Sequence, residues 1–233
     1  MPEKITEIKE SLLEIFFPSL CVSCEKYISS GFICQKCFAL IELNKTLFCP
    51  ICQARLPENK KICHKQSAYL LGPAANYDNP AIQNLIHYFK YKGLKDISHI
   101  LGGLMINYIN YLNIKNSKYL IIPIPLHRIK ERKRGFNQSE LLAKIISEKF
   151  GFEISENLKR IKNNKPQVEM KGIEKRKINI AGCFSLENPE EIKNKNVIIL
   201  DDVFTSGATI EEAARILKNA GAKKILALVI ARA

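Results

Sequence analysis

The sequence predicts an α/β protein: an open, mostly parallel, twisted sheet with helices on both faces, plus a small cysteine-rich module at the N-terminus. Strand, loop and helix signals follow one another within residues 121–150 and again within residues 197–230, the order of units in a parallel sheet. Seven of the eight cysteines lie between residues 21 and 63. The 233 residues are 46% hydrophobic and 25% charged, the composition of a packed globular protein. We expect two domains, residues 1–66 and residues 67–233.

The first residues predict an amphipathic helix, since Ile5, Ile8, Leu12 and Phe16 recur at helical spacing among glutamates and lysines. They lack the apolar stretch and the small-residue cleavage site of a secretory signal. No apolar run reaches the roughly 20 residues that a membrane-spanning helix needs. We therefore expect a cytoplasmic protein, in which disulfides are disfavoured and paired cysteines usually bind metal.

The cysteine spacing predicts a zinc module of the ribbon type. Zn²⁺ prefers four thiolate or imidazole ligands in a tetrahedron, and each Cys-x-x-Cys turn directs two sulfurs at one ion. Two such turns, at residues 21–24 and 34–37, form a first set, and Gly31 between them suits a tight turn. A segment this short has little core of its own, so metal binding would drive its folding. Redox chemistry is the alternative interpretation of this set.

A second set is incomplete in cysteine. Gln66 stands where another cysteine would complete the last Cys-x-x-Cys turn, so His64 is the best candidate for the fourth ligand. A metal-free turn, or a pairing across the two sets, stays open. Cys183, far from the others, is expected to be an inert buried thiol. The candidate zinc ligands are Cys21, Cys24, Cys34, Cys37, Cys49, Cys52, Cys63 and His64.

Aromatic residues alternate with lysines from Tyr88 to Gly93. The pattern is typical of the end of a helix with buried aromatics. Its alternative interpretation is a surface on which nucleobases stack while lysines contact phosphates.

The middle of the chain predicts a strand, a basic loop and a helix. Residues 121–126 are apolar and end in a Pro-x-Pro loop, and a helix is expected to run to about Phe150. Residues 127–180 hold 15 basic and 7 acidic residues and thus most of the formal net charge of +13. That excess favours an anionic partner such as nucleic acid or a phosphate compound. A solvated, lysine-rich surface is the alternative, as helix capping and surface polarity are for Asn137 and Gln138.

The strongest signal lies near the C-terminus. Residues 197–200 are an apolar, mostly β-branched strand, and Asp201 and Asp202 follow at its carboxyl end. A loop of small and hydroxylated residues comes next. A helix then begins, with Thr209 and Glu212 spaced as a capping box, and Gly221 is placed to end it before a strand over residues 225–230.

This arrangement predicts a ribose 5-phosphate site. Small residues let backbone N–H groups close around a phosphate at a helix N-terminus, where the helix dipole also favours negative charge. Carboxylates do not help to bind phosphate, but each can accept hydrogen bonds from the hydroxyls of a ribose diol. The candidate phosphate-binding residues are Thr205, Ser206, Gly207, Ala208 and Thr209.

Residues 197–209 resemble the phosphoribosyl pyrophosphate (PRPP) signature of the type I phosphoribosyltransferases, with Phe204 at a position where that family more often has an aliphatic residue. The strings Pro-Ile-Pro-Leu and Arg-Gly-Phe-Asn-Gln-Ser, in residues 123–139, further resemble the ComF family. Its members pair a cysteine-rich zinc module with a phosphoribosyltransferase-like domain. Gln66 departs from the family pattern, which commonly has its last zinc cysteine there.

The resemblance implies several expectations. Asp201 and Asp202 would be the catalytic, ribose-binding carboxylates, with Mg²⁺ and basic residues on the pyrophosphate. Residues 160–180 would be a mobile lid. The family implies a role in natural transformation, with single-stranded DNA and the DNA-uptake machinery as partners. The alternative is a PRPP-dependent phosphoribosyltransferase of nucleotide metabolism acting on an unidentified base, and a metal-dependent scaffold is a third interpretation. Further PRPP-binding candidates are Arg134, Gln138 and Arg176.

Overall fold

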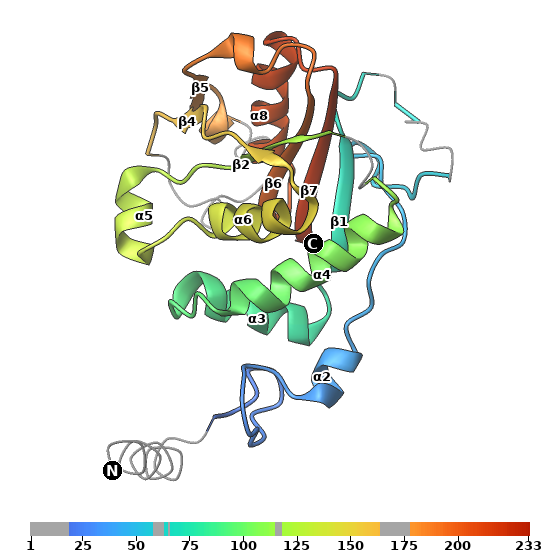
Figure 1. The fold of residues 1–233 in the computed structure, drawn as a ribbon, viewed down its shortest axis with the longest axis vertical. Coiled ribbons are helices and arrows are strands. Elements are labelled where there is room, and N and C mark those ends of the chain that lie inside the picture. Colours follow the sequence, from blue (N-terminus) through green and yellow to red (C-terminus); the bar gives the residue numbers. More distant parts are fainter. Residues whose placement is uncertain (1–18, 58–62, 65, 115–117, 164–177) are drawn as a thin grey trace.

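A computed structural model describes residues 19–57, 63–64, 66–114, 118–163 and 178–233, and Figure 1 shows their arrangement. Five parallel strands form a sheet in the order β1-β7-β6-β2-β3, so the predicted open parallel sheet is confirmed. A further pair, β4 and β5, is antiparallel and lies outside this sheet. The strands are β1 (Leu70–Asn76), β2 (Leu120–Pro123), β3 (Glu153–Ile154), β4 (Leu158–Arg160), β5 (Phe184–Leu186), β6 (Asn196–Phe204) and β7 (Lys224–Arg232).

Helices cover both faces of the sheet, as predicted. Buried residues of α3, α4 and α6 belong to one hydrophobic cluster, and those of α8 belong to the other. Along β6 the side chains alternate between the two, with Ile198 in the first and Ile199 in the second, as the two-residue period of a strand requires. The helices are α2 (Gln35–Ala39), α3 (Pro80–Tyr91), α4 (Ile97–Tyr111), α5 (Arg128–Arg134), α6 (Gln138–Phe150) and α8 (Ala208–Asn219), with a 3₁₀ turn at Pro189–Glu191.

Local sequence explains the boundaries of these helices. The side chain of Asn79 caps α3 by accepting from the backbone N–H groups of Ala81 and Ile82. Gly151 ends α6 in the left-handed conformation, and Gly221, also left-handed, follows α8 as predicted.

Two boundaries near the C-terminus differ from expectation. The strand does not end before the two aspartates: β6 continues through them to Phe204, because β7 stays paired with it as far as Arg232, whereas its pairing with β2 ends at Leu200. The capping box predicted for Thr209 and Glu212 is wrong. Gly207 is the N-cap of α8, at φ +75°, and Glu212 lies in the second turn, where its carboxylate bonds to other partners.

The cysteine-rich segment packs along the free side of the edge strand β1. Phe48 forms an antiparallel bridge with Leu71, and Leu43 forms another with Ala75. Leu47, Cys49 and Leu56 are buried in the same hydrophobic cluster as α3 and α4. The domain boundary near residue 66 stays a prediction.

Some predictions lie outside the described residues. They are the N-terminal helix, residues 164–177 of the lid expected over residues 160–180, and Arg176 within that segment. Within the part of the chain that the structure describes, no helix combines the length and the apolar character needed to span a bilayer.

Candidate functional site

The site predicted from the sequence lies between β2 and β6, where the order in which the chain adds strands to the sheet reverses. Strands β2 and β6 are neighbours, but the chain after β2 continues into α6 on one face and the chain after β6 into α8 on the other. In open parallel sheets, ligands bind beyond the carboxyl ends of two such strands. Here these ends carry the Pro123–Ile124 segment and the pair formed by Asp201 and Asp202, which we call the carboxylate pair.

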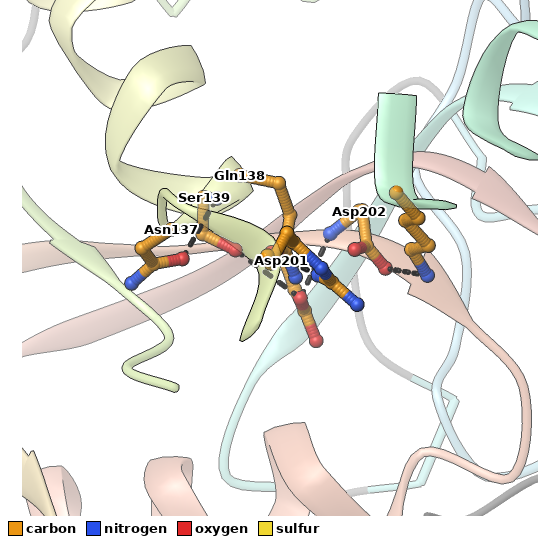
Figure 2. Close-up of polar contacts among 7 residues, drawn as sticks. Asn137, Gln138, Ser139, Asp201 and Asp202 are labelled. Atoms are coloured by element: carbon orange, nitrogen blue, oxygen red, sulfur yellow. Dashed lines mark hydrogen bonds and ion pairs between the residues drawn. The ribbon is translucent and has the colours of Figure 1, made fainter. Parts of the chain in front are cut away.

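Asp201 is tied to the start of α6. Its Oδ1 accepts hydrogen bonds from Ser139 Oγ at 3.3 Å and from the backbone N–H of Asp202 at 2.8 Å (Figure 2). Burial and the neighbouring charge of Asp202 raise the pKa of Asp201 to about 7, although Lys90 and these hydrogen bonds act in the opposite direction. Asp201 is therefore expected to change its charge near neutral pH.

Asp202 is buried and forms an ion pair that joins β6 to α3. Its Oδ1 lies 2.6 Å from the Nζ atom of Lys90, in the last turn of α3, while its buried Oδ2 has no hydrogen-bond partner among the described residues. Of the aromatic residues around Lys90, Phe89 is fully buried, as the helix-end interpretation predicts, whereas Tyr91 is exposed. The contact with Asp202 was missed, because nothing in a helix-end lysine indicates which strand it will reach.

The 205–209 loop joins β6 to α8. Gly207 adopts φ +75°, and a β-carbon there would lie 2.7 Å from Cζ of the Phe204 ring. The buried hydroxyl of Ser206 has no partner among the described residues. The ring of Phe204 thus packs against the turn from which α8 begins.

Arg134, the last residue of α5, lies close to Gln138, the first residue of α6, and its guanidinium donates to Oε1 of Gln138. The guanidinium also lies 5.8 Å from the ring centre of Tyr91. Asn137 caps α6 and donates to the carbonyl of Ile124, so the capping interpretation of this residue is confirmed. The side chain of Asn137 thereby holds α6 to the segment that follows β2.

The first four cysteines form one cluster, with all ligand atoms within 4.8 Å of one another. The sulfurs of Cys24 and Cys34 are 3.8 Å apart. Tetrahedral Zn–S bonds of about 2.3 Å separate neighbouring sulfurs by about 3.8 Å, so the cluster fits Zn²⁺. Although burial opposes it, hydrogen bonds from backbone N–H groups, that of Cys34 first, lower the pKa of Cys21 to about 6, which favours the thiolate form that binds metal.

Cys49, Cys52, Cys63 and His64 form the second cluster, again within 4.8 Å of one another. Nδ1 of His64 lies 3.3 Å from the sulfur of Cys63 and 3.4 Å from that of Cys49, so two adjacent residues do reach one centre. The ligand atoms group as the sequence predicted and do not pair across the two sets. Both clusters could hold zinc.

Arg232, at the end of β7, joins the second cluster to the sheet. Its guanidinium carbon lies 4.1 Å from the ring centre of Phe48, and its Nη1 donates to the carbonyl of Gln53 at 2.9 Å. Gln53 directly follows the Cys49–Cys52 turn. In the sheet, Arg232 is paired with Phe204, the residue under the 205–209 loop.

We expect Glu212→Ala to lower the free energy of unfolding at pH 7 by about 2 kcal/mol, the usual effect of losing hydrogen bonds to a charged group. The carboxylate accepts from the backbone N–H of Gly182 at 2.8 Å and from Arg215 at 2.9 Å. The hydrogen bonds from Arg215 hold the pKa of Glu212 below its usual 4.5. This contribution is therefore complete above pH 4.5 and disappears as the pH falls through the lowered pKa. Urea unfolding at pH 7 and at pH 3 would measure it; an equal loss at both values would contradict the assignment.

The comparisons with known proteins agree with this geometry. A family model described as "Phosphoribosyl transferase domain" matches residues 137–233. The chain is 28% identical to "Competence protein F" of Haemophilus influenzae, with 95% of this chain and 93% of the relative covered. It is 29% identical to "DNA utilization protein YhgH" of Escherichia coli K12 (89% and 94% covered) and 24% identical to "Competence protein ComFC" of Bacillus subtilis (87% and 79%). The similarity therefore extends over both the cysteine-rich segment and the sheet domain.

Proposed function

We propose that this chain, which belongs to the ComF family, binds PRPP or a related ribose 5-phosphate at the carboxyl ends of β2 and β6, and acts in the uptake or use of DNA. One observation carries the first part. The carboxylate pair and the 205–209 loop adjoin each other at the switch point of a parallel sheet, where such folds bind their ligands.

Different residues of the site would contact different parts of PRPP. The 205–209 loop, with its left-handed Gly207 and the unpartnered hydroxyl of Ser206, would receive the 5-phosphate at the N-terminus of α8. The unpartnered Oδ2 of Asp202 would accept from a ribose hydroxyl. Arg134 at the end of α5 and Gln138 at the start of α6 would face the pyrophosphate. Arg176, also proposed for PRPP, lies outside the described residues.

Mg²⁺ is proposed to accompany PRPP and, when bound, would neutralise part of the charge of the pyrophosphate. The residues fit such a cation, because one ammonium group, that of Lys90, only partly compensates two carboxylates. The residues of the chain would orient the ribose and would bind the 5-phosphate and the pyrophosphate at separate positions. Zn²⁺ is proposed for the two cysteine clusters, and paired cysteines that bind metal are typical of the cytoplasm, which supports the proposed cytoplasmic location.

The surface beside this site supports a single-stranded DNA partner. Helix α5 carries five basic residues between Arg128 and Arg134, and none of its residues is buried. Tyr91, under the guanidinium of Arg134, is 61% exposed. Basic side chains next to an exposed aromatic ring are the combination that contacts phosphates and stacks on bases in single strands. The names of the competence and DNA-utilization relatives favour this function over a purely metabolic transferase.

We expect Asp202→Asn to weaken PRPP binding by at least about tenfold, because the amide places N–H groups where a carboxylate oxygen should accept. Isothermal titration calorimetry with PRPP and Mg²⁺ would measure this. The same variant should retain its affinity for a fluorescent single-stranded oligonucleotide. Undiminished PRPP binding by Asp202→Asn, or no binding by the wild-type chain, would refute the proposed ligand.

The matched control is Arg132→Gln with Lys133→Gln on α5. It should leave PRPP binding intact but weaken oligonucleotide binding and reduce the slope of log affinity against log salt by about 1.4, at about 0.7 for each phosphate contact removed. If the wild-type chain bound the oligonucleotide with an affinity independent of salt, or did not bind it even at low salt, direct DNA binding would be refuted. The remaining candidate function would then be a PRPP-dependent transferase that acts on an unidentified base. Pyrophosphate release with candidate bases would then be the measurement of choice.

A further inference from the structure

Lys90 lies outside the segment that the phosphoribosyltransferase family model matches, yet it reaches the centre of the proposed ligand site. It belongs to α3, whereas the match begins at residue 137. The side chains of Lys90 and Asp202 are 19% and 6% exposed, and their Nζ–Oδ1 distance is 2.6 Å. Burying two charged groups is costly unless they are paired, so this contact fixes the position of both side chains.

The ion pair leaves one oxygen of Asp202 uncommitted. Lys90 occupies Oδ1, while the buried Oδ2 has no partner among the described residues. Buried polar atoms are nearly always hydrogen-bonded in native proteins, and an exception at the carboxyl end of a central strand points to a ligand. The buried hydroxyl of Ser206, in the 205–209 loop, is a second such atom among the described residues.

The charges around the pair explain why a cation is needed. Two carboxylates at successive positions of one strand repel each other, and without compensation one of them takes up a proton. The charge of Lys90 on α3 opposes this for Asp201, and Arg160 on β4 also interacts with Asp201. Burial by itself lowers the pKa of Lys90, but the charge of Asp202 and its hydrogen bond more than offset this and keep the ammonium form. Tyr91 is the other titratable group near Lys90.

We propose that Lys90 is a positioning residue of the ligand site: its ammonium group holds Asp202 by Oδ1 and offsets part of the charge of the carboxylate pair, so that Oδ2 accepts from a hydroxyl of the ribose. The proposal rests on the proposed PRPP site and adds a residue from α3 to it. Lys90 acts through Asp202 and need not touch the ligand. A lysine that only supported the fold would change stability without changing how ligand affinity depends on pH.

The test compares the full-length wild-type chain with Lys90→Met, Lys90→Arg and Lys92→Met, by calorimetric titration with PRPP and Mg²⁺ between pH 6 and pH 8.5. Lys92, exposed at the C-cap of the same helix, is the matched control. We expect Lys90→Met to lower the affinity at pH 7 about tenfold or more and to move the acidic limb of the affinity profile upward by about one pH unit. Lys90→Arg should keep the limb near its wild-type position, and Lys92→Met should match the wild type. Titration of the ligand's own phosphates is common to all four proteins and cancels in the comparison.

A ligand-free measurement separates this inference from the proposed function. Carboxyl ¹³C shifts of labelled aspartate should show the pair titrating at higher pH in Lys90→Met than in the wild type. Should Lys90→Met fail to fold, Lys90→Met/Asp202→Asn removes the uncompensated carboxylate, and its affinity should then equal that of Asp202→Asn alone. An acidic limb that does not move in Lys90→Met, or a double variant clearly weaker than Asp202→Asn, overturns the role of Lys90. No PRPP binding by the wild-type chain at any pH overturns the proposed function, and with it the ligand-directed role.

Discussion

Replacing Cys49 with serine is expected to remove the metal ion from the second cluster and to lower the free energy of unfolding by several kcal/mol. Structural zinc contributes on the order of 10 kcal/mol of folding free energy in small modules, and a site that loses one of four ligands keeps only part of it. Cys49 is fully buried and follows Phe48, which is bridged to β1. Its loss should therefore destabilise the edge of the sheet as well as the cluster.

Metal analysis of purified protein and thermal unfolding with and without a chelator would measure both effects. We expect two zinc ions per wild-type chain and one in Cys49→Ser. Cys183→Ser is the matched control, because it changes a buried thiol in the same way but lies outside both clusters. A wild-type chain that is folded and metal-free, or a Cys49→Ser chain with two ions, would contradict the assignment.

Gly207→Ala is expected to weaken PRPP binding by more than about tenfold and to destabilise the fold by about 1–3 kcal/mol, the cost of strained backbone in a non-glycine residue. Two causes act together. Alanine disfavours φ +75°, and its β-carbon would lie 2.7 and 2.9 Å from two carbons of the Phe204 ring. The ring is buried and cannot move without displacing β6, so the loop must shift away from the position that receives the phosphate.

A second substitution separates the two causes. Phe204→Leu in the Gly207→Ala background removes the ring and should recover part of the stability, while the backbone strain and most of the lost affinity persist. Gly103→Ala is the matched control, because a β-carbon there meets nothing within 4 Å and the residue lies inside α4. Calorimetry and urea unfolding would supply the readouts. Wild-type affinity in Gly207→Ala would exclude this loop as the phosphate site.

The sequence predicts the regular parts of this molecule well, for reasons that are local. The apolar runs at residues 121–126 and 197–200 predict buried parallel strands because both faces of such a sheet are covered. The cysteine spacing predicts both clusters because ligand geometry depends on a few neighbouring residues. Even His64 was identified as the best remaining ligand by its residue type.

Contacts between distant segments were beyond prediction. Glu212 has the spacing of a capping box, but Gly207 is the N-cap of α8. The carboxylate of Glu212 instead accepts a hydrogen bond from the backbone N–H of Gly182. The partners of Lys90 and Arg232 depend on where α3 and β7 lie relative to β6, which no local pattern encodes. Both contacts converge on the ends of the strands, where the candidate site lies.

The antiparallel bridges along β1 bear on the solubility of the molecule. A strand at the border of a sheet exposes a row of N–H and C=O groups that can pair with another chain. At one border, β3 offers only two residues; at the other, residues 43–48 run beside β1 and hydrogen-bond to it through Phe48 and Leu71. A chain that began at residue 67 would leave β1 uncovered and open to edge-to-edge association. We therefore expect the cysteine-rich segment to limit such association, and a variant that cannot bind metal there to aggregate more readily.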